Sequence, residues 1–217
     1  MSDVNALKPK LEAGLLEMGL HIDAEKQKKL LDYVALIHKW NQVHNLTAVR
    51  EQSDMVTLHI LDSLSVLPYI TCQNLLDVGA GAGLPSIPLA ICLPELKVTA
   101  IDSVQKKVSF MSQAKAQLKL ANFNAVHGRI EDQTVEDLNA GEGFEVITSR
   151  AFSEIALFTK LTRHLIANDG VWLAMKGSIP EREFEKAGIK PAEIKVLEVA
   201  GLDAERHLIV INKKIDL

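Results

Sequence analysis

The stretch "LLDVGAGAGLPSIPLA" (Leu75–Ala90) decides the fold, because a short apolar run ends there in a turn rich in glycine. It contains, in order, an acid, three alternating glycines and two prolines: Asp77, Gly79, Gly81, Gly83, Pro85 and Pro88. Glycine permits a positive φ and lets a ligand approach the backbone closely. A strand, a glycine turn and a following helix predict a site for a nucleotide-like ligand at the end of the first strand.

Apolar runs alternate with helical periodicity through the residues that follow. The expected strands are Asn74–Gly79, Leu96–Asp102, Phe123–Gly128, Phe144–Arg150 and Gly170–Gly177. The expected helices are Ser86–Leu93, Val104–Leu120, a short acidic one near Gln133–Leu138, and Ser153–Ala167. Continuous apolar strands that alternate with helices predict a doubly wound parallel sheet covered on both faces.

The two ends of the chain follow other patterns. Glu193–Leu202 and Arg206–Lys214 are predicted strands joined by too few residues for a crossover helix, so they should form an antiparallel hairpin. The N-terminal residues have helical periodicity and no strand pattern. We therefore expect an α/β fold of about seven strands over residues 71–217, and a helical extension over residues 1–70 with helices at Asp23–His44 and Asp54–Leu67.

Four interpretations of the glycine turn compete. A dinucleotide fingerprint needs glycine at the sixth position, where Leu84 stands, and Pro88 removes an N–H group that a pyrophosphate would need. A P-loop would need Gly-Lys-Ser/Thr, which this turn lacks. S-adenosylmethionine has no phosphate, and Asp77 suits its positively charged groups. A strand-to-helix turn that binds no ligand is the fourth alternative.

The end of the second predicted strand narrows the choice of ligand. Asp102 stands there, nineteen residues after Gly83. A carboxylate at this position can accept both ribose hydroxyls of an adenosine. Because NAD and S-adenosylmethionine both contain adenosine, Asp102 does not separate them. The antiparallel hairpin favours the sheet of S-adenosylmethionine-dependent methyltransferases, by analogy at the level of the fold.

Composition and charge bound the class of protein. The net charge of −4 over 217 residues gives no support for nucleic-acid binding, although residues 101–130 carry five basic groups against one acid. That basic patch is compatible with a phosphate backbone and equally with solvated helix faces. Cys72 and Cys92 lack metal or disulfide spacing, which favours a reducing cytosol. We expect no signal peptide and no membrane-spanning run.

Blocks along nearly the whole chain resemble the RsmG family, also called GidB. They are "HKWNQVHNLTAVR" (His38–Arg50), "HILDSL" (His59–Leu64), "DVGAGAGLPSIPLA" (Asp77–Ala90), "IDSVQKKVSFM" (Ile101–Met111), "SRAF" (Ser149–Phe152), "MKG" (Met175–Gly177) and "ERHLIVI" (Glu205–Ile211). The resemblance implies a Rossmann-like, S-adenosylmethionine-dependent methyltransferase that methylates N7 of guanine 527 in 16S ribosomal RNA. It implies a cytoplasmic protein whose partner is 16S ribosomal RNA or the small ribosomal subunit, and we expect a monomer without a metal.

The resemblance also implies site residues. It adds cofactor contacts to the turn residues and Asp102, so that the predicted set is Asp77, Gly79, Gly81, Gly83, Leu84, Asp102, Ile130, Glu131 and Arg150. Arg150 could instead contact an RNA phosphate or form a buried ion pair. We predict RNA contacts for Arg50, Lys106 and Lys107, with solvated side chains as the alternative. The family usually has glycine where Ser86 stands, which leaves open how closely the following helix approaches the cofactor.

The implied chemistry needs little from side chains. Guanine N7 carries a lone pair and no proton, so we predict no catalytic acid or base and a mechanism of positioning and water exclusion. Glu131 and Asp77 could stabilise the charge of the product base, or serve in ribose contact and loop structure. We interpret His59 and Asp62 as a helix-surface hydrogen bond, and Trp40 as core. The alternatives are a small-molecule methyltransferase and a non-catalytic RNA- or cofactor-binding protein of the same fold.

Overall fold

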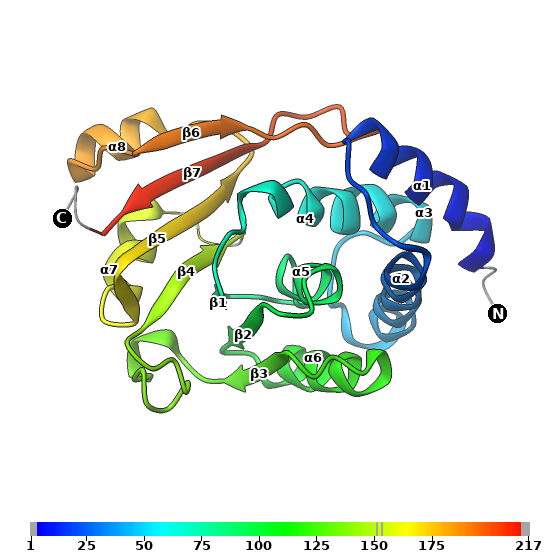
Figure 1. The fold of residues 1–217 in the computed structure, drawn as a ribbon, viewed down its shortest axis with the longest axis horizontal. Coiled ribbons are helices and arrows are strands. Elements are labelled where there is room, and N and C mark those ends of the chain that lie inside the picture. The colour runs from blue at the N-terminus through cyan, green and yellow to red at the C-terminus, as the bar shows by residue number, and fades with distance from the viewer. Residues whose placement is uncertain (1–3, 151, 153, 214–217) are drawn as a thin grey trace.

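A seven-stranded sheet forms the centre of the computed structural model, which describes residues 4–150, 152 and 154–213. Its strands are β1 (Asn74–Val78), β2 (Lys97–Asp102), β3 (Phe123–His127), β4 (Phe144–Ser149), β5 (Ile166–Lys176), β6 (Glu193–Val196) and β7 (His207–Asn212). The order is β3-β2-β1-β4-β5-β7-β6, in which β7 runs antiparallel to both neighbours and the other pairs are parallel (Figure 1). The α/β fold and its C-terminal antiparallel hairpin are confirmed.

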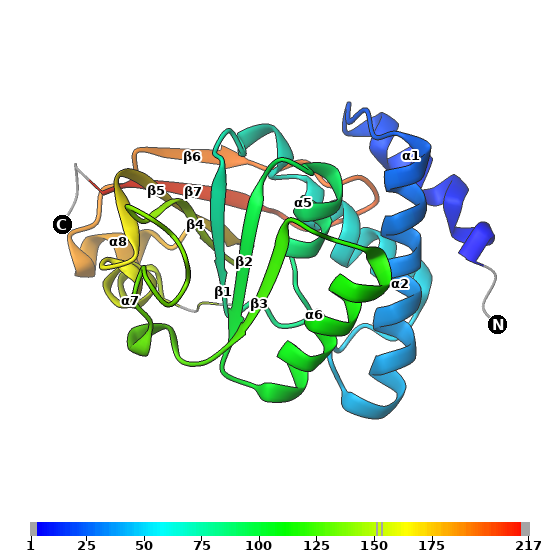
Figure 2. The same ribbon diagram turned by 60° about the horizontal axis from the view of Figure 1, so that its bottom comes forward.

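Helices cover both faces of the sheet (Figure 2). In chain order they are η1 (Val4–Leu7), α1 (Lys8–Glu17), α2 (Ala24–His44), α3 (Gln52–Met55), the π-helix η2 (Val56–Leu61), α4 (Asp62–Leu64), η3 (Leu67–Tyr69), α5 (Ser86–Cys92), α6 (Gln105–Leu118), η4 (Ile130–Asp132), α7 (Ile155–Thr162) and α8 (Glu181–Ala187). Helices α5 and α6 pack on one face with α2 outside them, while α7 and α8 lie at the other face.

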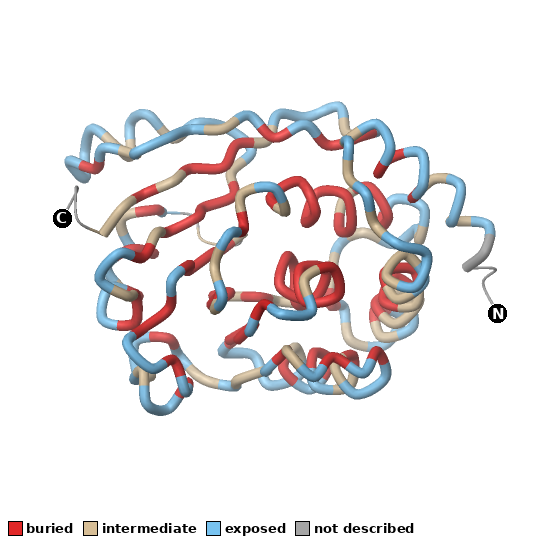
Figure 3. The backbone as a smooth tube through the Cα atoms, in the orientation of Figure 1, coloured by how far each residue is buried: buried red, intermediate tan, exposed pale blue. Residues whose placement is uncertain are grey.

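Side chains alternate between two apolar clusters along the central strands. On β1, Leu75 belongs to the cluster under α2, α5 and α6, and Leu76 to the cluster under α7. On β4, Val146 and Ile147 divide in the same way. Successive side chains of a strand point to opposite faces of the sheet, and here both faces are covered. Figure 3 shows the buried residues concentrated in the sheet and in α5.

Helix α2 connects the N-terminal region to the sheet. Asp23 caps it, because its Oδ1 accepts the Lys26 amide at 2.9 Å, and Asn45 ends it in the left-handed region at φ 49°. Its buried side chains, Leu30 and Val34 among them, belong to the same apolar cluster as the sheet. In the described part of the chain, no helix is long and apolar enough to cross a membrane. The division at residues 70 and 71 stays a prediction.

The segment Gln133–Leu138 forms turns, so the prediction of a short acidic helix was wrong. The Thr134 amide donates to Asp137 Oδ2 at 3.1 Å, and the Asp137 amide donates to Thr134 Oγ1 at 3.1 Å. These reciprocal bonds are those of a capping box, so they start a helical turn that does not continue. Asn139, at φ 52°, then turns the chain.

The predicted helix Ser153–Ala167 is too long, and its first residue lies outside the described residues. Helix α7 ends at Thr162, and β5 begins at Ile166. The Phe144 amide donates to the Leu165 carbonyl at 2.8 Å, so pairing with β4 draws this apolar segment into the sheet. Helical spacing alone does not reveal that competition.

Strand β6 is shorter than the predicted Glu193–Leu202. Leu197, Val199 and Ala200 leave the sheet edge and are buried in the larger apolar cluster. The next strand matches its prediction over His207–Asn212, while the last residue predicted for it, Lys214, lies outside the described residues. Burial in the N-terminal half of the molecule therefore ends the hairpin pairing early.

Candidate functional site

The glycine turn follows β1 and leads the chain into α5. Gly79, Gly81 and Gly83 have φ values of +68°, +61° and +83°, in the left-handed region that favours glycine. The Gly79 and Ala80 amides both donate to the Ile101 carbonyl, at 2.9 and 3.1 Å, which ties the turn to the end of β2. A Cβ on Gly81 would meet only the Gly79 carbonyl, at 4.0 Å. The turn thus presents bare backbone at the carboxyl edge of the sheet.

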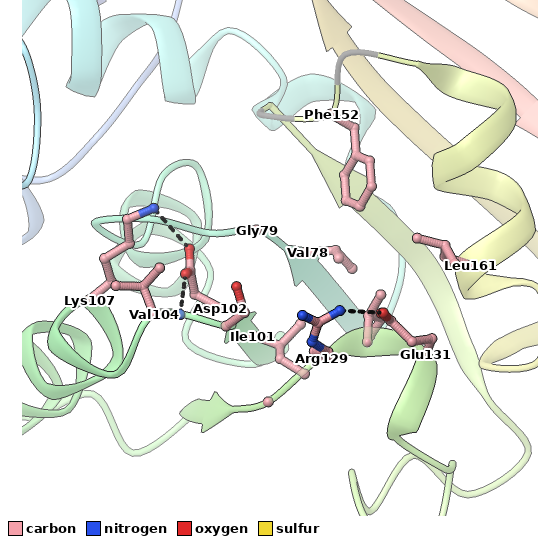
Figure 4. A pocket seen from close by; sticks show the side chains of 13 residues that line it. Val78, Gly79, Ile101, Asp102, Val104, Lys107, Arg129, Glu131, Phe152 and Leu161 are labelled. Carbon is pink, nitrogen blue, oxygen red and sulfur yellow. Dashed lines mark hydrogen bonds and ion pairs between the residues drawn. The ribbon is translucent and has the colours of Figure 1, made fainter.

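Asp102 ends β2 beside this turn (Figure 4). Its Oδ2 accepts the Gly81 amide at 2.9 Å and the Lys107 ammonium at 3.4 Å, and its Oδ1 accepts the Val104 amide at 2.9 Å. Because a carboxylate has about four acceptor sites, Oδ1 keeps one for a ligand hydroxyl. A second hydroxyl can replace Lys107 on Oδ2. Asp102 can therefore fix the turn and bind a ribose at once.

A cleft of about 400 Å³ opens where these groups meet. Its lining consists of Val78, Gly79, Ile101, Asp102, Ser103, Val104, Lys107, Gly128, Arg129, Ile130, Glu131, Phe152 and Leu161. Apolar side chains supply walls for a base, and Phe152 points into the cleft (Figure 4). With the Asp102 carboxylate and the bare glycine backbone, this set fits an adenosine-bearing cofactor such as S-adenosylmethionine.

Four of the predicted cofactor residues line this cleft: Gly79, Asp102, Ile130 and Glu131. Gly81 and Gly83 shape the turn, and Leu84 is buried in the core behind it. Glu131 is exposed and pairs with Arg129 at 3.5 Å. Cofactor contact stays a prediction for each of the nine residues in the predicted set.

Asp77 lies beneath the turn and is fully buried. Its Oδ2 accepts the Ser86 amide at 3.3 Å, while Oδ1 has no partner among the described residues. Burial raises the pKa of Asp77 to about 6, against the opposing effects of nearby Ser86 and Arg150. The Ser86 hydroxyl lies close to the carboxylate but outside hydrogen-bonding geometry. This position suits loop structure, one of the roles considered for Asp77.

Arg150 lines a second cavity, of about 430 Å³. The second cavity is lined by Val49, Leu58, His59, Asp62, Arg150, Met175, Lys176, Gly177 and Arg206. Among the described residues it shares none with the cofactor cleft. Arg150 lines the second cavity and Phe152, two residues further along the chain, lines the cofactor cleft, so the two cavities lie next to each other.

Asp62 joins two arginines in the second cavity. Its Oδ2 accepts Arg150 Nη1 at 3.0 Å, and its Oδ1 accepts Arg206 Nε at 2.8 Å. The Asp62 carboxylate is buried, whereas the side chains of Arg150 and Arg206 are 28% and 26% exposed. We call these three residues the guanidinium clamp. Of the alternatives for Arg150, the structure contains the ion pair.

His59 lies in the π-helix beside the clamp and is buried. Its Nε2 is 2.9 Å from Thr47 Oγ1, which also accepts the Val49 amide at 3.2 Å. Burial, together with the nearby Arg150 guanidinium, lowers the pKa of His59 to about 4, so the imidazole is neutral at pH 7. The interpretation of His59 and Asp62 as a surface hydrogen bond was wrong, because both are buried and have other partners.

The three residues predicted to contact RNA have different surroundings. Arg50 is exposed, and its Nη2 donates to Asn45 Oδ1 at 3.2 Å. Lys106 is exposed in the first turn of α6, whereas Lys107 turns into the cofactor cleft and pairs with Asp102. RNA contact stays a prediction for Arg50, Lys106 and Lys107.

Trp40 and the two cysteines are packing residues. Trp40 is half-buried and lies edge-on to Phe110, with ring centroids 5.4 Å apart, which confirms its interpretation as core. Cys72 is half-buried and Cys92 is buried, and burial raises the pKa of both thiols to about 12. Within the described ranges, no group of three or more His, Cys, Asp or Glu side chains could hold a metal ion.

Tyr33 is a site residue that the sequence pattern did not reveal. Its buried hydroxyl donates to the Ala82 carbonyl and lies 3.3 Å from the Gly83 carbonyl. Burial raises the pKa of Tyr33 well above its usual value, so the hydroxyl remains a donor. Helix α2 therefore holds the glycine turn from behind. A tyrosine within the apolar stripe of a helix is predicted to be a core residue, and the sequence pattern gives no sign that its hydroxyl contacts the glycine turn.

Comparison with known proteins gives the family. The family model "GidB: rRNA small subunit methyltransferase G" matches residues 26–209. "Ribosomal RNA small subunit methyltransferase G" of Methylobacillus flagellatus is 58% identical over 205 residues, covering 94% of this chain and 98% of that protein. The protein of the same name from Laribacter hongkongensis is 46% identical, covering 95% and 98%.

Solved structures agree on the fold. A SAM-dependent methyltransferase from Aquifex aeolicus superposes with a TM-score of 0.53 at 21% identity, over 70% of this chain and 90% of that one. A predicted O-methyltransferase from Agrobacterium tumefaciens gives 0.53 at 18% identity, over 70% and 78%. The strand order and the glycine turn are therefore those of a methyltransferase fold, and the chain belongs to the rRNA small subunit methyltransferase G family.

Proposed function

We propose that this protein transfers a methyl group from S-adenosylmethionine to N7 of guanine 527 in 16S ribosomal RNA. The observation that carries the proposal is the 58% identity with ribosomal RNA small subunit methyltransferase G of Methylobacillus flagellatus, over nearly the whole of both chains. The proposal includes action in the cytoplasm, as a monomer, on 16S RNA or the small ribosomal subunit.

The cofactor cleft supports this choice of methyl donor. In the proposal Asp102 accepts the ribose hydroxyls, and Lys107 gives up its contact with that carboxylate. Ile130 and Val104 flank the adenine, and the backbone of the glycine turn faces the rest of the cofactor. When bound, S-adenosylmethionine supplies an electrophilic methyl group on a sulfonium.

The chain then has to position the guanine and exclude water. Guanine N7 presents a lone pair without a proton, so no side chain needs to remove one. The titratable groups nearby fit a reaction without a catalytic base. His59 is buried and neutral, and Asp62 accepts hydrogen bonds from Arg150 and Arg206. We place the target base between the two cavities, beside the segment that follows β4. Glu131 lies in the cleft where it can favour the positive charge that the product base gains.

Three measurements on one preparation test the proposal against its alternatives. Small ribosomal subunits without the modification, and their deproteinised 16S RNA, are incubated with the protein and S-adenosylmethionine labelled in the methyl group. We expect label in the RNA, cofactor binding, and RNA affinity that falls as salt rises.

Each alternative gives a different pattern in these measurements. A small-molecule methyltransferase would bind the cofactor and show no salt-sensitive RNA affinity. A non-catalytic binding protein would bind RNA or cofactor and leave the RNA unlabelled. Absence of label with the cofactor demonstrably bound would overturn the proposal for both RNA substrates.

A further inference from the structure

We propose that the guanidinium clamp of Arg150, Asp62 and Arg206 binds a phosphodiester of the RNA strand next to the methylated nucleotide. In this proposal Asp62 is a positioning residue that holds both guanidinium groups. The inference rests on the proposed function and names the part of the site that holds the RNA backbone.

The charge of the second cavity favours an anion. Arg150, Arg206 and Lys176 line it against the single carboxylate of Asp62, and the neighbouring His59 is neutral at pH 7. The Glu183 and Glu154 carboxylates act on Lys176, so the positive charge in excess is that of one guanidinium of the clamp, in a protein whose net charge is −4. One buried carboxylate needs one cation, so a second guanidinium exceeds what a structural ion pair requires.

The donors of the clamp are only partly used. Arg150 Nη1 donates to Asp62 at 3.0 Å and to the Leu58 carbonyl at 3.2 Å. Arg206 donates to Asp62 through Nε and to the Glu205 carbonyl through Nη1, at 2.9 Å. Within residues 4–150, 152 and 154–213, the hydrogen bonds of Arg150 and Arg206 run through Nη1 and Nε, and Nη2 of each forms none. These Nη2 groups keep N–H donors of the fork that suits phosphate oxygens.

Asp62 determines where those forks lie. It belongs to α4, while Arg150 follows β4 and Arg206 precedes β7, 88 and 144 residues further along the chain. Its two carboxylate oxygens each hold one guanidinium, so both arginines are oriented before any ligand arrives. Such preorganisation reduces the entropy that binding would otherwise cost.

The location separates this site from the cofactor. The second cavity shares no described lining residue with the cofactor cleft, and it lies at the ends of β4 and β5, whereas the cofactor cleft lies at the ends of β1 and β2. A phosphodiester in the clamp would therefore anchor the strand on the other side of the segment after β4. The target base could then reach across that segment towards the methyl group.

Binding measurements on the full chain test the clamp. Filter binding to unmethylated 16S RNA and to small subunits gives the RNA Kd at several salt concentrations, and calorimetry gives the S-adenosylmethionine Kd. For Arg206→Ala we expect an RNA Kd about tenfold higher and a log–log salt slope smaller by about 0.7, as for one lost phosphate contact on a single strand. The cofactor Kd should stay within about twofold, which also shows that the variant is folded.

Two further variants separate geometry from charge. Arg206→Lys keeps the charge and loses the fork, so we expect it to keep the salt slope and to recover only part of the affinity. Asp62→Asn removes a negative charge from a positive site, so charge alone predicts tighter RNA binding. Loss of the second guanidinium contact predicts weaker binding, which is the result we expect. Arg182→Ala, an exposed residue of α8, is the control for an equal change of charge.

The outcomes that overturn the inference are distinct. If wild-type protein methylates RNA and Arg206→Ala binds it equally well, the clamp is a structural ion pair and the proposed function stands. If the cofactor Kd rises while the RNA Kd does not, the clamp holds the carboxylate of the cofactor. Tighter binding by Asp62→Asn contradicts the positioning role. If wild-type protein neither binds nor methylates RNA, the proposed function itself fails.

Discussion

Replacing Asp77 with asparagine is expected to stabilise the protein above pH 7 and to bring little gain near pH 4. Burial raises the pKa of Asp77 from 3.8 to about 6. The folded protein therefore binds this proton more tightly than the unfolded chain does, and wild-type stability falls as the pH rises from about 4 to about 6. Asparagine cannot ionise, keeps an acceptor for the Ser86 amide, and avoids that loss.

The size of the effect follows from the shift. A pKa difference of about two units corresponds to about 3 kcal/mol over the whole titration. Because the unfolded carboxyl titrates near 4, wild-type protein loses about 1–2 kcal/mol of this stability between pH 5 and pH 8. That difference amounts to roughly 3–6 °C in Tm for a chain of this size. His59 acts in the opposite direction, because burial lowers its pKa from 6.5 to about 4, but it is common to both proteins and cancels.

Urea unfolding at pH 5 and pH 8 measures this directly. Wild-type protein, Asp77→Asn and Asp203→Asn are compared, the last as an exposed carboxyl that loses the same charge. We expect the free energy of unfolding of Asp77→Asn, relative to wild type, to be larger at pH 8 than at pH 5 by about 1–2 kcal/mol. An equal difference at both pH values, or a larger one at pH 5, would refute the assignment of a raised pKa to a buried, half-satisfied carboxylate.

Three substitutions and one control variant test the cofactor cleft. Tyr33→Phe removes the donor to the Ala82 carbonyl, so urea unfolding should show about 1 kcal/mol less stability and calorimetry a cofactor Kd several-fold higher; unchanged affinity would mean that α2 does not support the turn. Asp102→Ala removes the acceptor of the Gly81 and Val104 amides and of the ribose, and should raise the cofactor Kd at least about tenfold; the same Kd as wild type would contradict the ribose assignment. Lys107→Ala removes a cation that competes with the cofactor for Asp102, so we expect it to tighten cofactor binding. Lys106→Ala removes an exposed lysine on the same helix turn, and we expect the cofactor Kd to stay unchanged. Equal effects of the two variants would show that the position of Lys107 in the cleft does not matter.

Local patterns predicted most of the fold. Short apolar runs predicted all seven strands, and the short connection before His207 predicted that β6 and β7 pair antiparallel. The limits Asp23 and His44 of one helix were predicted, because capping depends on residues close in sequence. The errors at Thr162 and Val196 have another origin, since pairing with β4 and burial against the N-terminal half decide those ends.

The site residues also divide into those that local sequence predicts and those that only contacts between distant segments bring together. The glycine turn and Asp102 lie at strand ends, where topology alone brings them together, so the sequence could predict them. The guanidinium clamp joins Asp62, Arg150 and Arg206 from three distant segments, and no spacing rule links them. Tyr33 was hidden for a similar reason, since its ring follows the apolar pattern and only its hydroxyl contacts the turn.

The position of the transferred methyl group tests the central claim most directly. Small subunits lacking the modification are incubated with the protein and S-adenosylmethionine, and the RNA is then cleaved chemically at N7-methylguanine and mapped by primer extension. The account predicts one new cleavage, at guanine 527, that requires both the cofactor and the protein. A methyl group on another atom or another nucleotide, or no cleavage in subunits and in 16S RNA alike, would contradict it.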